Sequence, residues 1–157
     1  MTIQNRRQFL ATAFALVIAV SGLGGNAQAA TEQQAQDMVA KAIALYAEMG
    51  EAAIAIFNDG KASGFAEGEI YIVVQSRGAE GKVLAHAANA KLVGTSLSDI
   101  SDPNGLKFGE VMSTEATTDG GWFEYDWPNP ATGQVGRKKS WAVLFGDLVF
   151  IAGIYLR

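Results

Sequence analysis

The sequence has no cysteine and only one histidine among its 157 residues. Without cysteine the chain can form no disulfide, thiolate nucleophile, iron–sulfur cluster or cysteine-based zinc site. The single histidine, His86, excludes an intrachain metal site built on two histidines. We therefore expect no metal and no cofactor.

Charge is also scarce, and it is not concentrated in one region. Charged residues make up 18% of the chain, with 12 basic and 16 acidic residues and a formal net charge of −4. No basic stripe is present, which argues against nucleic acid as a partner. The apolar fraction of 49% is enough for the core of one domain and argues against an acidic disordered protein.

The first residues have the features of an export signal. Arg6 and Arg7 form a positive segment, residues 9–23 are apolar, and residues 27–29 read Ala-Gln-Ala, which places a cut before Ala30. The apolar run is short for a membrane span, which needs roughly 20 residues. We interpret residues 1–29 as a signal peptide and residues 30–157 as a single domain.

The stretch around the two arginines resembles the twin-arginine export motif, and an ordinary secretory signal is the alternative. Either route places the protein in the periplasm of a bacterium or outside the cell. After cleavage the chain would have ten basic and sixteen acidic residues, a net charge of −6, and no membrane-spanning segment. Retention of the leader as an anchor stays open.

The mature chain begins with a long helical pattern. Residues 31–34, Thr-Glu-Gln-Gln, have the spacing of a capping box, and apolar residues then recur every three or four positions through Phe57. A stop signal follows at residues 58–60. We expect one helix of roughly 40 Å, which needs a broad apolar surface such as a sheet.

From residue 69 the pattern becomes typical of strands. We expect a hairpin, then a short helix at about 106–116, and then three antiparallel strands. The predicted strands cover residues 70–74, 82–87, 122–127, 139–145 and 148–156. The predicted class is α+β, with the long N-terminal helix packed on one antiparallel sheet of about five strands.

Aromatic residues gather in the segment 120–133, GGWFEYDWPNPATG. Alternation along a strand places Phe123, Tyr125 and Trp127 on one face, and Trp122, Glu124 and Asp126 on the other. If the long helix covers one face of the sheet, loops and the short helix must cover the second, where a small cavity can survive. Tyr125 and Trp127 would wall such a cavity; the alternative is that all these rings are core.

Three further side chains are candidates for binding an anion. Lys138 could neutralise a ligand carboxylate, although a solvated charge cluster with Lys139 is the alternative. His86 could donate a hydrogen bond, with a protonation state sensitive to pH near its ordinary pKa of about 6.5. Tyr71 could line the cavity with its phenol. Both His86 and Tyr71 could instead be purely structural.

No pattern in the sequence favours catalysis. Glu124 and Asp126 are typical of a solvent-facing strand, Ser140 has no recognisable catalytic partner, and no glycine-rich loop joins a strand to a helix to hold phosphates. We therefore assign no catalytic residue and expect the protein not to be an enzyme.

Several motifs together resemble one family, the single Cache domain, type 2. They are His86, Gly94, the Asp-Pro-Asn-Gly turn at 102–105, the aromatic block at 120–130, Lys138-x-Ser140-Trp141, and Ala152-Gly153-Ile154-Tyr155. The resemblance covers nearly all of the mature chain and implies a PAS-like fold. Trp141 departs from the family pattern, where tyrosine is common. Lys138 matches the family's lysine, which is why it is preferred over Lys139.

The resemblance also implies a function. Members of this family are extracytoplasmic sensor modules that bind small ligands, often short carboxylates, and usually belong to chemoreceptors, histidine kinases or cyclases. Since the sequence ends at Arg157, we expect a free-standing exported form. We predict a sensor of small organic anions that uses Tyr71, His86, Tyr125, Trp127 and Lys138 and acts through a membrane-bound receptor or sensor kinase. The alternatives are a ligand-free interaction module docking on such a receptor, or a small periplasmic hydrolase.

Overall fold

The computed structural model describes residues 29–78 and 80–157. Residues 1–28 of the predicted signal peptide lie outside this range. The described part contains three α-helices: α1 (Glu32–Met49), α2 (Ala52–Asn58) and α3 (Phe108–Glu115). In this part of the chain no helix has the length and apolar character needed to cross a membrane.

One antiparallel sheet of five strands forms the centre of the molecule. Its order is β4-β3-β7-β6-β5. The strands are β3 (Val73–Ser76), β4 (Val83–His86), β5 (Gly121–Pro128), β6 (Val135–Phe145) and β7 (Leu148–Tyr155). A two-stranded ribbon, β1 (Ala66–Glu67) and β2 (Ile70–Tyr71), lies beside it. The predicted α+β class, with a long N-terminal helix on an antiparallel sheet of about five strands, is confirmed.

The capping box at the start of α1 is present as predicted. Thr31 Oγ1 accepts the Gln34 N–H, and Gln34 Oε1 accepts the Thr31 N–H at 2.8 Å. The prediction of one continuous helix through Phe57 is wrong. Gly50 adopts a positive φ of 60°, and its N–H bonds back to the Tyr46 carbonyl at 2.8 Å. This conformation, which favours glycine, ends α1 and starts α2 in a new direction.

The predicted strand 70–74 is also divided. Its first half, β2, pairs with β1, and its second half, β3, pairs with β4 and β7. The break at Ile72 places Tyr71 in the ribbon instead of the main sheet.

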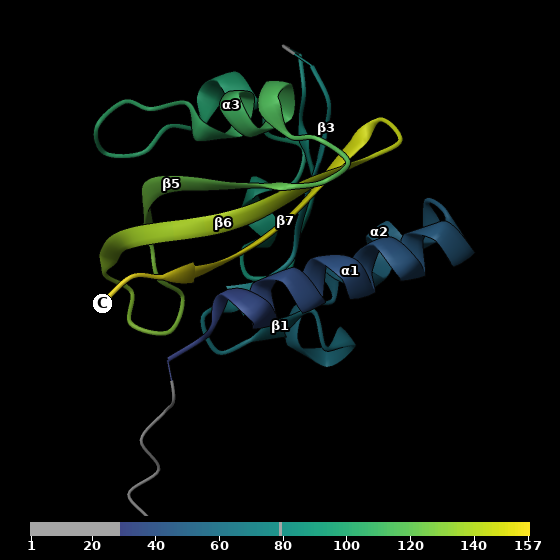
Figure 1. Cartoon of the computed structure of the whole chain (residues 1–157), viewed down its shortest axis with the longest axis horizontal. Helices are drawn as coiled ribbons and strands as arrows, with labels where there is room; N and C mark the ends of the chain where they lie inside the picture. The colour runs from purple at the N-terminus through teal and green to yellow at the C-terminus, as the bar shows by residue number, and fades with distance from the viewer. Residues whose placement is uncertain (1–28, 79) are drawn as a thin grey trace, which may run out of the picture.

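The two faces of the sheet are covered differently (Figure 1). On one face, Val39 and Ala42 of α1 pack in a cluster with Phe150 and Ala152 of β7. On the other face, Met112 of α3 packs in a second cluster with sheet residues such as Ile151. Strand alternation in β5 follows the prediction: Trp122 belongs to the α1 cluster, whereas Phe123, Tyr125 and Trp127 belong to the α3 cluster.

Candidate functional site

A cavity lies between the sheet and the layer formed by α3 and the connecting loops. All five residues singled out from the sequence line it: Tyr71 from β2, His86 from β4, Tyr125 and Trp127 from β5, and Lys138 from β6. The fold therefore brings together side chains that are up to 67 positions apart in the chain. Ile151, Val73 and Gln75 form more of its floor.

Lys138 lies at the centre of this arrangement. Its register places it opposite Tyr125 on β5 and Tyr155 on β7, so the lysine points away from α1. It is only 2% exposed. Its Nζ lies 3.7 Å from the centroid of the Tyr71 ring and 5.3 Å from that of Tyr155. Within the described residues the ammonium has no hydrogen-bonding or ion-pair partner and is held by aromatic faces.

Burial has a direct effect on the lysine. Desolvation lowers the pKa of Lys138 to about 7, partly opposed by the negative charge of Glu69. A buried cation without a carboxylate in contact is costly, and it becomes favourable when an anion enters the same space. Among the described residues, Lys138 is therefore a buried cation with no carboxylate in contact.

His86 contacts the lysine region through Tyr71. Its ring stacks on the Tyr71 ring with centroids 4.9 Å apart, and its Nδ1 accepts the Asn89 N–H at 3.0 Å. Burial and then the Lys138 charge lower the pKa of His86 to about 3. The imidazole is therefore neutral at neutral pH, with its proton on Nε2. The prediction that its charge would respond to pH near 6.5 is wrong, because the sequence does not report its burial.

The neutral state of His86 can be measured directly because the chain has no other histidine. In NMR spectra recorded from pH 8 to pH 4 we expect its ring resonances to show no titration step near 6.5. Since the pKa is about 3 in the folded protein and about 6.5 in the unfolded chain, the unfolded chain binds more protons between these values. Stability should then fall as the pH falls from about 6.5. A midpoint near 6.5 in the folded protein would contradict this assignment.

The aromatic wall is formed by β5 together with the start of α3. Phe108 stacks on Tyr125 with centroids 3.9 Å apart and planes at 5°, and meets Trp127 edge-on at 5.0 Å. The Tyr125 hydroxyl forms a buried hydrogen bond with Ser140 Oγ at 3.0 Å. Burial raises the pKa of Tyr125 above its ordinary value. Tyr125 and Trp127 are thus both core residues and wall residues, so the two sequence interpretations do not exclude each other.

Other residues that line the cavity are not identified by patterns in the sequence. The cavity is also closed by apolar side chains from the connecting segments and α3: Leu92, Leu97, Ile100, Phe108 and Met112. The spacing of Phe108 and Met112, four residues apart in the predicted short helix, could have indicated a shared buried face. The loop residues carry no such signal, because only the tertiary structure folds them over the sheet.

The other charged candidates lie elsewhere. Lys139 points to the α1 side, where its Nζ pairs with Glu32 at 2.6 Å. Glu124 and Asp126 pair with Arg137 at 3.4 Å and 3.5 Å and stay partly exposed, as a solvated strand face predicts. Across residues 29–78 and 80–157, no cluster of three acidic or histidine side chains is placed to hold a metal ion.

The open space inside the cavity is small. Its volume is about 30 Å³, room for about two water molecules. A short organic acid fits only if part of the wall moves. Leu92 and Phe108 come from the loop and helix layer and not from the sheet.

Known proteins share this architecture. One solved structure, described as the structural basis for carboxylic acid recognition by a Cache chemosensory domain, has a TM-score of 0.58 at 21% identity, covering 80% of this chain and 88% of that one. A periplasmic sensor domain of a chemotaxis protein has a TM-score of 0.56 at 21% identity, covering 80% and 90%. These likenesses show the fold.

In sequence, 73 residues are 36% identical to the methyl-accepting chemotaxis protein McpP of Pseudomonas putida. The match covers 46% of this chain and 13% of that much longer receptor. The sequence model of single Cache domain 2 matches residues 26–156, which includes every helix and strand described above. The chain therefore belongs to the single Cache domain 2 family.

Proposed function

We propose that this protein is an exported sensor of short organic acid anions that acts through a partner protein. The observation that carries the proposal is the Lys138 ammonium, which is buried among aromatic rings with no acidic side chain in contact. The carboxylic acid recognition named for a Cache domain of the same fold supports the ligand class.

The geometry suggests a role for each side chain. Lys138 would bind the carboxylate by charge-assisted hydrogen bonds. His86, with its proton on Nε2, would donate a second hydrogen bond without adding a competing charge. Tyr71 would contribute its phenol, and Tyr125 and Trp127 would enclose the apolar part of the ligand. These contacts would bind and orient the ligand; no covalent step is proposed.

Signalling would depend on the movement of the cavity wall that ligand entry requires. A ligand that fits only after Phe108 or Leu92 shifts binds the opened arrangement more tightly than the closed one, and so favours it. The outer surface of α3 and its loops would then present a different face to a partner. We propose a membrane-bound chemoreceptor or sensor kinase as that partner, in the periplasm or outside the cell. The predicted signal peptide and the periplasmic chemotaxis sensor of similar fold support this location.

Calorimetric titration with two- to four-carbon carboxylates, including acetate, pyruvate and lactate, tests the ligand class. We expect at least one to bind, and the substitution Lys138→Met to weaken that binding by about 10- to 100-fold, as expected for loss of a charged hydrogen bond. The matched control is Lys139→Met, because Lys139 is the next residue but faces α1. If no carboxylate binds, or if both variants bind equally well, the proposal fails.

The affinity should also depend on pH. Lys138 must be protonated to bind an anion, and its pKa in the free protein is about 7. Above this value, binding requires uptake of a proton, so we expect the affinity to fall about tenfold per pH unit between roughly pH 7.5 and pH 9. Titrations in buffers of different ionisation enthalpy would report the proton taken up. A pH-independent affinity over this range would contradict the role of Lys138.

A further inference from the structure

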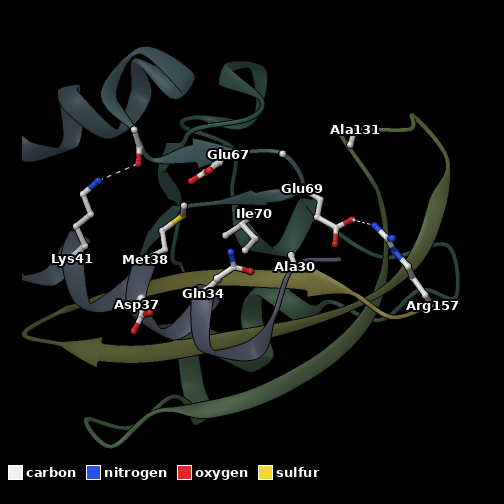
Figure 2. A pocket seen from close by; sticks show the side chains of 12 residues that line it. Ala30, Gln34, Asp37, Met38, Lys41, Glu67, Glu69, Ile70, Ala131 and Arg157 are labelled. Atoms are coloured by element: carbon white, nitrogen blue, oxygen red, sulfur yellow. Dashed lines mark hydrogen bonds and ion pairs between the residues drawn. The ribbon is translucent and has the colours of Figure 1, made fainter. Parts of the chain in front are cut away.

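A second and larger groove lies on the opposite side of the molecule from α3. It has a volume of about 480 Å³ and runs between the first turns of α1 and the β1–β2 turn (Figure 2). Its lining includes Ala30 and Gln34 at the start of the helix, and Glu67 and Glu69 on the turn. No lining residue of the proposed carboxylate site lines this groove, although the charge of Glu69 acts on Lys138.

Glu69 is the unusual residue in this groove. The residue is 7% exposed, so its carboxylate is largely removed from water. Its Oε2 accepts a hydrogen bond from Asn129 Nδ2 at 3.1 Å and lies 3.5 Å from an Arg157 guanidinium nitrogen. Its Oε1 is buried and has no hydrogen-bond partner among the described residues. A buried carboxylate oxygen without a donor is unfavourable, so a donor is missing from this place.

The chain itself can supply that donor. Ala30 lines the same groove as Glu69, and Figure 2 shows the Glu69 carboxylate paired with Arg157, with Ala30 on the segment that leads into α1. In the uncut chain the Ala30 nitrogen is an amide with one hydrogen. Cleavage before Ala30, which the sequence predicts, would convert it into an ammonium group with three hydrogens and a positive charge.

We propose that the α-ammonium group created at Ala30 by removal of the signal peptide pairs with the buried carboxylate of Glu69. This ion pair would fix the start of α1 to the β1–β2 turn. It would also extend to the loop after β5, because Glu69 already holds Asn129. The proposal rests on the predicted cut before Ala30 and not on the ligand of the cavity.

The surrounding charges determine how strong this pair can be. Arg157 shares Glu69 from the other side, and the positive end of α1 opposes an ammonium at its start. Asp37 and Glu67 in the groove and Glu32 at the start of α1 favour the ammonium. Lys41 is engaged with the Gly64 carbonyl at 3.3 Å and the Phe65 ring, and Lys139 with Glu32. Lys41 and Lys139 are thus bound elsewhere, whereas Lys138 also interacts electrostatically with Glu69, from the cavity side.

The test compares two forms of the chain 30–157, which contains every described helix and strand. One form begins with a free Ala30, released from a fusion by a protease that leaves no extra residue; the other carries an N-acetyl group. We expect the free form to unfold at a temperature higher by about 3–6 °C at pH 6.5. A paired ammonium has its pKa raised above the ordinary value of about 7.7–8.0. The difference should therefore persist below that value and disappear as the pH rises toward about 10.

Two variants separate the proposed pair from a general effect of the terminal charge. Glu69→Gln keeps the shape of the side chain and should abolish the difference between the free and acetylated forms. Glu67→Gln, on the same turn and in the same groove, should retain it. Equal unfolding temperatures of the free and acetylated wild-type forms would overturn the proposal, even if Glu69→Gln does not fold. A difference that persists in Glu69→Gln would also overturn it, as would an exported protein whose first residue by mass spectrometry is not Ala30.

Discussion

The substitution Lys138→Met is expected to stabilise the protein, by roughly 5 kcal/mol below pH 7, while weakening carboxylate binding. Burial holds the pKa of Lys138 at about 7, against 10.5 for an ordinary lysine. Each pKa unit corresponds to about 1.4 kcal/mol of preference for the neutral form, so the difference between 10.5 and about 7 destabilises the folded state with a charged lysine by roughly 5 kcal/mol. Methionine occupies a similar volume and has no charge to bury.

The stability gained by Lys138→Met should depend on pH in a characteristic way. Between about pH 7 and 10.5 the unfolded chain holds a proton on Lys138 that the folded protein has released. Wild-type stability should therefore rise with pH across this window, whereas the Lys138→Met variant should lack that rise. The gain from the substitution is then largest below pH 7 and vanishes near pH 10.

Urea unfolding at one-unit intervals from pH 6 to pH 9 would measure both features. The Lys139→Met control removes only a surface pair with Glu32 and should change stability by less than about 1 kcal/mol. A Lys138→Met variant less stable than wild type at pH 6 would show that the ammonium has a stabilising partner, and the site would have to be revised. A buried lysine that lowers stability is typical of a group retained for binding.

Replacing Gly153 with alanine is expected to destabilise the fold by about 3 kcal/mol or more. Gly153 lies on β7 directly opposite Ser140 of β6. A β-carbon at this position would overlap Ser140 Oγ, and would lie 2.6 Å from the Lys139 carbonyl oxygen and 2.9 Å from Ser140 Cα. Two of these three atoms are backbone, so no side-chain rotation can relieve the overlap.

The Gly153→Ala substitution should also disturb the packing of the cavity wall. Separating β7 from β6 displaces Ser140, whose hydroxyl is hydrogen-bonded to Tyr125 at 3.0 Å. Thermal unfolding would give the loss of stability, and near-ultraviolet circular dichroism would report a changed environment of the aromatic rings. Gly136→Ala is the matched control, because the added carbon meets only Tyr155 Cδ1, at an ordinary 3.4 Å. Similar losses in the two variants would show that the close approach at Gly153 is unimportant.

Local patterns in the sequence predicted much of this structure. A capping box and a three-and-four spacing identify α1, and alternation along residues 122–127 correctly separates Trp122 from Tyr125 and Trp127. These patterns depend on neighbours within a few positions, which is why they can be read without the fold. The apolar spacing does not predict the break at Gly50, because the spacing continues across it and, within residues 31–57, only this one residue takes a positive φ.

The chemistry of the site was decided by the tertiary structure. The sequence shows a lysine within a basic run, Arg137-Lys138-Lys139, and strand alternation predicts only that neighbouring side chains point to opposite faces. Which of those faces is shielded from water depends on where α1 and α3 pack on the sheet. Those packing contacts join segments that are far apart in the sequence. Desolvation acts through the whole surrounding volume, so the pKa of Lys138 near 7 and the neutral His86 exist only once the fold has enclosed them.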